Sequence, residues 1–179
     1  MKTNRTLKLI TLTAAIFGFA ATSFGQITAT DGAAHAFATI IRPITLASED
    51  DLEFGIITAS TDGGTVTVPP TGTVTTSGVT LYDDSQQPAS YDVSGEAGYT
   101  YSITLPASVT LSNNTGATMN VTGFKTNSGT ETEEPAGSTG NSFDANGDAT
   151  FYVGATLNIG AAQTSGEYTG TFSVTVAYE

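Results

Sequence analysis

Apolar and polar residues alternate with a period of two over most of the chain, which predicts β-strands with one face directed to a core. The clearest runs span residues 99–105, 151–159 and 172–178. Shorter runs cover 52–56, 66–68, 79–81, 91–93, 109–111 and 119–121. Threonine fills many of the outward positions, because its branched side chain suits a pleated strand while its hydroxyl stays solvated.

Turn-forming residues separate these runs. Asp62-Gly63-Gly64, Asn114-Thr115-Gly116, Asn146-Gly147 and Ser165-Gly166 tolerate the positive φ that hairpin corners require. After residue 25 the sequence shows no spacing typical of an amphipathic helix. About ten short strands, each with one apolar face, predict an all-β antiparallel sandwich of two sheets.

Two segments depart from the alternation. Residues 126–141 are rich in Gly, Ser, Thr and Glu, and are predicted to form a long surface loop. Residues 27–34 are small and polar, and residues 26–38 are predicted to be a flexible N-terminal extension. The first strong strand is expected over 37–46, and a single domain over 39–179.

The first 25 residues have the three parts of a secretory signal peptide. A positive start with Lys2, Arg5 and Lys8 precedes an apolar stretch over 9–21, and small residues flank the expected cleavage site before Gln26. The apolar stretch is shorter than the roughly 20 residues of a membrane span, although an N-terminal anchor is the alternative. We therefore expect an exported protein, in the periplasm, on the outer surface or outside the cell, without a membrane span after cleavage.

Charge and composition exclude several classes of function. The chain carries 17 acidic and 5 basic residues, for a net charge of −12. Removal of the signal peptide leaves only Arg42 and Lys125 against the same acids, a net charge of −15. Such a chain lacks the basic patch that nucleic acids require. It also has no cysteine for disulfides or zinc, so we expect no cofactor.

Candidates for chemistry are few. Asp144, Asn146 and Asp148 have the spacing of the first ligands of a calcium loop, but position twelve holds Ala155 instead of glutamate, and a hairpin turn is the favoured interpretation. The acidic residues of 49–53 are interpreted as a solvated loop. His35 is the single histidine and lies in the small-residue extension, so we expect no catalytic triad and no enzyme.

Five segments together resemble a bacterial secreted family, the domain of unknown function 4402, over roughly residue 39 to the C-terminus. They are LEFG at 52–55, GTVTVPPTG at 64–72, GYTYSITLP at 98–106, TFYVGATL at 150–157 and YTGTFSVTVAY at 168–178. The family name implies no activity.

A more distant resemblance is to chaperone–usher fimbrial subunits of the spore coat U-like type. It rests on the LEFG segment and on the last strand, whose penultimate residue is aromatic. The resemblance implies an immunoglobulin-like sandwich that lacks one strand, which a periplasmic chaperone and then the N-terminal extension of the next subunit supply. The donor side chains would be Ala34, Ala36, Ala38 and Ile40, or the opposite face with Phe37, Thr39 and Ile41. The receiving edge would be the last strand, with Phe172, Val174, Val176 and Tyr178. This sequence lacks the cysteine pair usual in those subunits.

These observations lead to two hypotheses. The first is an exported, non-enzymatic structural or adhesive protein of the cell surface that self-associates by strand donation. The second is a monomeric secreted module that binds glycan or host protein through its loops, with residues 37–46 serving as the domain's own first strand.

Overall fold

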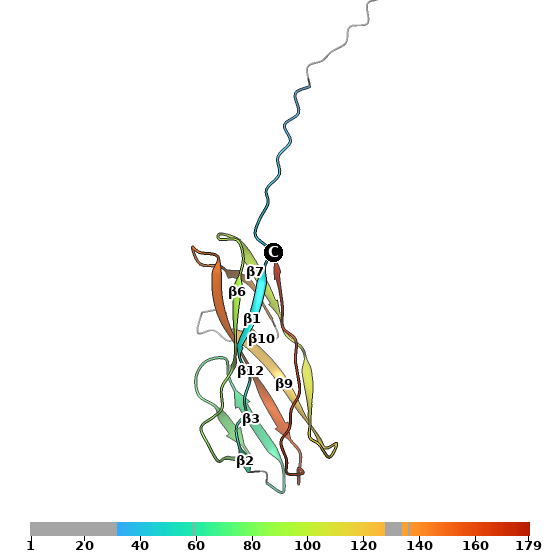
Figure 1. Ribbon diagram of the computed structural model, residues 1–179. Coiled ribbons are helices and arrows are strands. Elements are labelled where there is room, and N and C mark those ends of the chain that lie inside the picture. The colour runs from blue at the N-terminus through green and yellow to red at the C-terminus, as the bar shows by residue number, and fades with distance from the viewer. Residues whose placement is uncertain (1–31, 59, 128–133, 136) are drawn as a thin grey trace, which may run out of the picture. The chain divides into compact units, whose positions relative to one another are not determined.

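The computed structural model describes residues 32–58, 60–127, 134–135 and 137–179, and in these ranges it is all-β with antiparallel pairing throughout (Figure 1). The chain divides into two units, Met1–Ala38 and Thr39–Glu179. The predicted signal peptide lies outside the described residues. Thr39–Glu179 forms a β-sandwich, as the alternation predicts, and ten of the described strands have three residues or more.

The larger sheet is organised around one long strand, β12 (Asp148–Ile159). Its first half pairs with β6 (Ala89–Ser94) and its second half with β3 (Gly64–Val68). Gly154 lies at the change of partner, where the Cβ of any other residue would collide with the carbonyl oxygen of Val68. The remaining strands of this sheet are β1 (Thr45–Asp50) beside β6, β4 (Thr75–Ser77) beside β3, β9 (Thr118–Asn127) beside β12, and β8 (Ser108–Ser112) and β10 (Glu134–Pro135), both beside β9.

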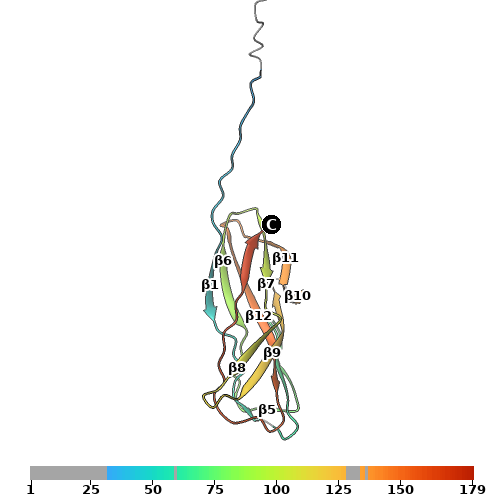
Figure 2. The same ribbon diagram turned by 90° about the vertical axis from the view of Figure 1, so that its right-hand side faces the viewer.

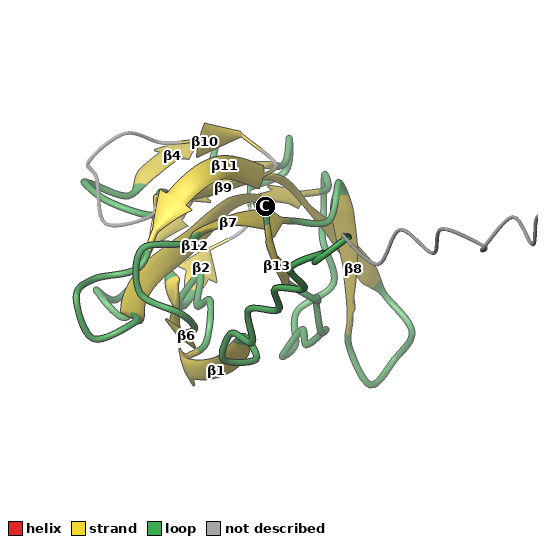
Figure 3. Cartoon of the chain, turned by 90° about the horizontal axis from the view of Figure 1, so that it is seen from above, coloured by secondary structure: helices red, strands yellow, loops and turns green. Residues whose placement is uncertain are grey.

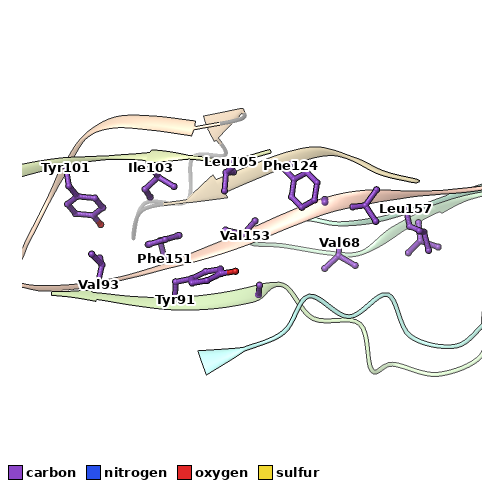
Figure 4. Packing of buried hydrophobic residues seen from close by; sticks show 14 of the residues in the cluster. Val68, Tyr91, Val93, Tyr101, Ile103, Leu105, Phe124, Phe151, Val153 and Leu157 are labelled. Carbon is purple, nitrogen blue, oxygen red and sulfur yellow. The ribbon is translucent and has the colours of Figure 1, made fainter. Parts of the chain in front are cut away.

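A smaller sheet of β11 (Gly137–Ser142), β7 (Thr100–Thr104) and β13 (Thr175–Tyr178) completes the sandwich, with β7 in the middle (Figures 2 and 3). The short strands β2 (Ile57–Thr58) and β5 (Thr80–Leu81) form a separate pair. The core lies between the sheets, where Tyr101 and Ile103 of β7 face Phe151 and Val153 of β12 (Figure 4).

The predicted alternation is confirmed along the central strands. Phe151 and Val153 are fully buried, while Tyr152 between them is 39% exposed. The same pattern holds in β3 and β7. Cores of this kind are stabilised mainly by the removal of apolar surface from water.

The predicted loop over 126–141 is wrong at both of its ends. Thr126 and Asn127 are buried at the end of β9, and 137–142 form β11. Ser138 and Asn141 occupy the buried positions of β11, where the Asn141 amide donates to the Tyr101 carbonyl oxygen at 3.0 Å and to Ser138 Oγ at 2.9 Å. Polar residues satisfied by hydrogen bonds give no apolar period, which is why the alternation missed this strand.

The prediction of a first strand over 37–46 is also wrong, because strand pairing begins only at Thr45. Further along, the run over 52–56 does not continue its alternation. Gly55 has a φ of +75°, a conformation that shifts the inward position to Ile57 and leaves Ile56 59% exposed. A side chain at Gly55 would also collide with the Gln86 amide.

Candidate functional site

A groove of about 1360 Å³ lies in the Thr39–Glu179 domain, between the inner face of the larger sheet and the segment that leads into β13. One wall is the chain that continues from β1, including Leu52, Phe54 and Ile57. The other wall is the segment that leads into β13, including Phe172 and Val174. The groove therefore lies where the domain's first and last segments meet.

The floor of the groove is apolar. Phe124 lies at its base with 3% of its surface exposed, and its ring centroid is 5.2 Å from that of Phe172. Leu111 and Met119, from β8 and β9, line the same space and are only half-buried. These side chains face the core but lack a complete cover, so a ligand that covers them would remove apolar surface from water.

Both strands that flank the groove are edge strands. Among the described strands, β1 pairs with β6 alone, and β13 pairs with β7 alone. All six residues of β1 are exposed, in contrast to the mostly buried β6 and the alternate burial of β7. An edge strand has main-chain N–H and C=O groups available to a further strand. The groove thus combines an apolar floor with backbone edges that could pair with an added strand.

The rim of the groove is polar and acidic. Asp51 and Glu53 border one wall and Glu167 borders the other. Tyr91 also lines the groove, with its ring stacked on Phe151 and the centroids 5.3 Å apart. Burial raises the pKa of the Tyr91 hydroxyl, and the Asp51 carboxylate raises it further, while a hydrogen bond with Ser48 acts in the opposite direction. The rim would therefore favour a neutral or basic ligand over an acidic one.

The described part of the N-terminal extension, residues 32–38, has no strand pairing and is exposed, and residues 39–41 after it are also unpaired and largely exposed. Phe37 is 92% exposed and Ile40 is 95% exposed. The donor candidates Ala34, Ala36 and Ala38 are exposed as well. An extended segment with large apolar side chains in water is unusual for a domain that has finished burying its apolar surface.

Arg42, which follows the extension, is hydrogen-bonded to the domain through both its backbone and its side chain. Its backbone N–H donates to Glu96 Oε2 at 3.0 Å, and its guanidinium donates to the Asn146 carbonyl oxygen at 3.3 Å. The Tyr178 hydroxyl donates to the Arg42 carbonyl oxygen at 2.8 Å and accepts from the Glu96 N–H at 2.7 Å. We call this cluster of Arg42, Glu96, Asn146 and Tyr178 the Arg42 clasp.

The structure distributes the four residues predicted for the receiving edge between two positions. Val176 and Tyr178 belong to β13, whereas Phe172 and Val174 precede it and line the groove. All four are half-buried and pack against the core.

The candidate calcium residues lie in the turn between β11 and β12. Asp144 Oδ1 accepts hydrogen bonds from the backbone N–H groups of Asn146 and Asp148, both at 2.8 Å. These bonds are the main reason that the pKa of the Asp144 carboxyl is lowered. Asp148 in turn accepts from the Ser94 hydroxyl at 2.7 Å. Within the described ranges, no three His, Cys, Asp or Glu side chains converge as metal ligands would.

The groove carries no signal in the sequence that marks it as a site. The period of two places Leu111 and Met119 on inward faces, but alternation alone does not distinguish a covered core from an uncovered one. The Arg42 clasp was missed too, although Arg42 is one of only two basic residues after position 25 of a strongly acidic chain, a signal that could have suggested it. The part of the chain that the structure describes also contains no helix long and apolar enough to cross a membrane.

Comparison with known proteins identifies one family. Residues 44–178 match the model of a family described as "Domain of unknown function (DUF4402)". No curated protein and no solved structure matches the chain. The more distant likeness to fimbrial subunits is not confirmed by these comparisons.

Proposed function

Because the chain belongs to the DUF4402 family, whose description names no activity, we propose a function from its geometry: an exported, non-enzymatic structural or adhesive subunit of the cell surface. Subunits associate when the N-terminal extension of one adds a strand to the groove of another. Export rests on the signal-peptide pattern of residues 1–25.

One observation carries the proposal. The same chain has an incompletely covered apolar groove between two edge strands and, ahead of its first strand, the exposed apolar side chains of Phe37 and Ile40. In β-augmentation, an added strand gains main-chain hydrogen bonds along the edge, and its alternate side chains fill the pockets. A periplasmic chaperone that occupies the groove before assembly would protect it from non-specific association.

Deletion of the extension tests the proposal. Three forms of the mature chain are compared by light scattering after size exclusion: residues 26–179, residues 39–179, and residues 26–179 with a Gly-Ser segment of equal length at 26–38. We expect soluble oligomers from the first form only. The other two are expected to stay monomeric or to precipitate, because their grooves remain uncovered.

Equal behaviour of the three forms would contradict the proposal. If residues 26–179 remain monomeric at high concentration and melt at the same temperature as both variants, the domain is complete by itself. The proposal would then be wrong, and a monomeric secreted ligand-binding module would replace it.

A further inference from the structure

The groove and the extension together indicate which side chains are donated. Resting on the function proposed above, we infer that Phe37 of one copy enters the groove of a second copy and packs on the Phe124–Phe172 floor. The alanine face of the extension, which ends at Ile40, then points away from the floor.

The two faces of the extension differ in the size of their side chains. Successive side chains of an extended strand point to opposite sides, so Phe37 and Ile40 cannot both enter the groove. One face offers three methyl groups and Ile40, and the other offers His35, Phe37 and Thr39. A groove of about 1360 Å³ would be left largely unfilled by alanines, and unfilled apolar space destabilises a packed interface. An aromatic ring also adds favourable contact with the tilted rings of Phe124 and Phe172.

The extension and the rim of the groove differ in charge. From Gly32 to Ile41 the extension contains no acidic residue, whereas Asp51, Glu53 and Glu167 border the groove. The rings of His35 and Phe37 lie on the same side of the segment, with centroids 6.1 Å apart. When Phe37 points to the floor, the imidazole of His35 therefore enters beside it, near an acidic rim that favours a positive or neutral group.

The bonds that Arg42 makes with its own domain indicate that the acceptor is a second copy. Both backbone polar groups of Arg42 are bonded to its own domain, and Pro43 holds Arg42 toward an extended conformation. For Phe37 to enter its own groove, the chain would have to reverse within residues 38–41. Thr39, Ile40 and Ile41 are β-branched and are poor residues for a tight turn. The acceptor is therefore another molecule.

Paired variants of the full mature chain test the inference. Phe37→Ala is compared with Ile40→Ala, which removes an equally exposed apolar side chain from the opposite face. Because a fully buried Phe side chain contributes about 1.5–3 kcal/mol, we expect Phe37→Ala to raise the concentration for half-assembly roughly 10- to 100-fold. Ile40→Ala is expected to raise it less than about threefold. A larger effect at Ile40 than at Phe37, or equal effects at both, would overturn the inference.

Photo-crosslinking identifies the acceptor independently of these affinities. A benzoylphenylalanine at position 37, in an equal mixture of ¹⁵N-labelled and unlabelled chains, should produce mixed-isotope crosslinks to peptides that contain Phe172 or Leu52. Crosslinks confined to single chains would show insertion into the chain's own groove and overturn the inference. Oligomers without groove crosslinks would refute it while leaving the proposed function standing, whereas a monomeric wild type would refute the proposed function itself.

Discussion

The Tyr178 hydroxyl holds two segments of the domain together, and its removal gives a sharp prediction. In the Arg42 clasp this hydroxyl accepts from the Glu96 N–H and donates to the Arg42 carbonyl oxygen, at 2.7 Å and 2.8 Å. Tyr178→Phe removes only the oxygen. The ring keeps its edge contact with Phe143, whose centroid lies 6.0 Å away.

The size of the effect follows from those two bonds. A neutral hydrogen bond contributes about 0.5–1.5 kcal/mol net, and the Arg42 carbonyl is exposed enough to bond water instead. We therefore expect the free energy of unfolding to fall by about 1–2 kcal/mol. For a domain of this size, that corresponds to a fall in Tm of roughly 3–8 °C.

Thermal melts followed by circular dichroism measure this change. Tyr82→Phe is the matched control, because it removes the same atom from a side chain that is 80% exposed. Amide hydrogen exchange adds a local readout, with faster exchange expected in Tyr178→Phe at the Glu96 amide, which loses its acceptor. Equal melting temperatures and equal exchange for the two variants would refute the structural role assigned to the clasp.

Three further predictions concern the core, the pH dependence and the turn at Asp144. Phe151→Ala removes a fully buried ring and is expected to lower the unfolding free energy by about 3–5 kcal/mol in urea titrations; a loss below about 1 kcal/mol would contradict the packing described. Burial raises the pKa values of Tyr91 and Tyr101, so the folded state holds their protons more tightly than the unfolded state. Stability should thus be unaffected by these groups below pH 10 and fall as the pH rises above it, more steeply than in Tyr91→Phe; parallel pH profiles would contradict this. Calcium is expected to leave the Tm unchanged relative to chelator, because the turn itself satisfies the Asp144 carboxylate, and a rise that Asp144→Asn abolishes would show a cation site instead.

The sequence predicted those parts of the fold in which burial is apolar and alternates. Phe151, Val153 and Leu157 lie where the period of two places them. The strand β11 escaped prediction because Ser138 and Asn141 are buried through hydrogen bonds, which leave no hydrophobic period. The positive φ of Gly55 similarly reverses the inward and outward positions of its neighbours.

The candidate site was predictable only in part. The inward positions of Phe172 and Val174 follow from the sequence pattern. The groove does not, because it depends on which strands fail to meet across the sandwich. Pairing between distant segments is a tertiary property, and neither Leu52 nor Met119 carries a local signal that its neighbour is missing.

The position of the Arg42 clasp has a mechanical consequence for an assembled chain. Tension on the extension enters the domain at Arg42, so the contacts with Glu96, Asn146 and Tyr178 bear the load first. The force then passes along β1, whose hydrogen bonds to β6 run across the strand and resist shear together instead of unzipping singly. Ser48 of β1 also borders the groove. A force strong enough to displace β1 would therefore weaken the binding of the neighbouring subunit's extension in that groove. In an assembled fibre, partial unfolding of one subunit would thus promote dissociation of the next.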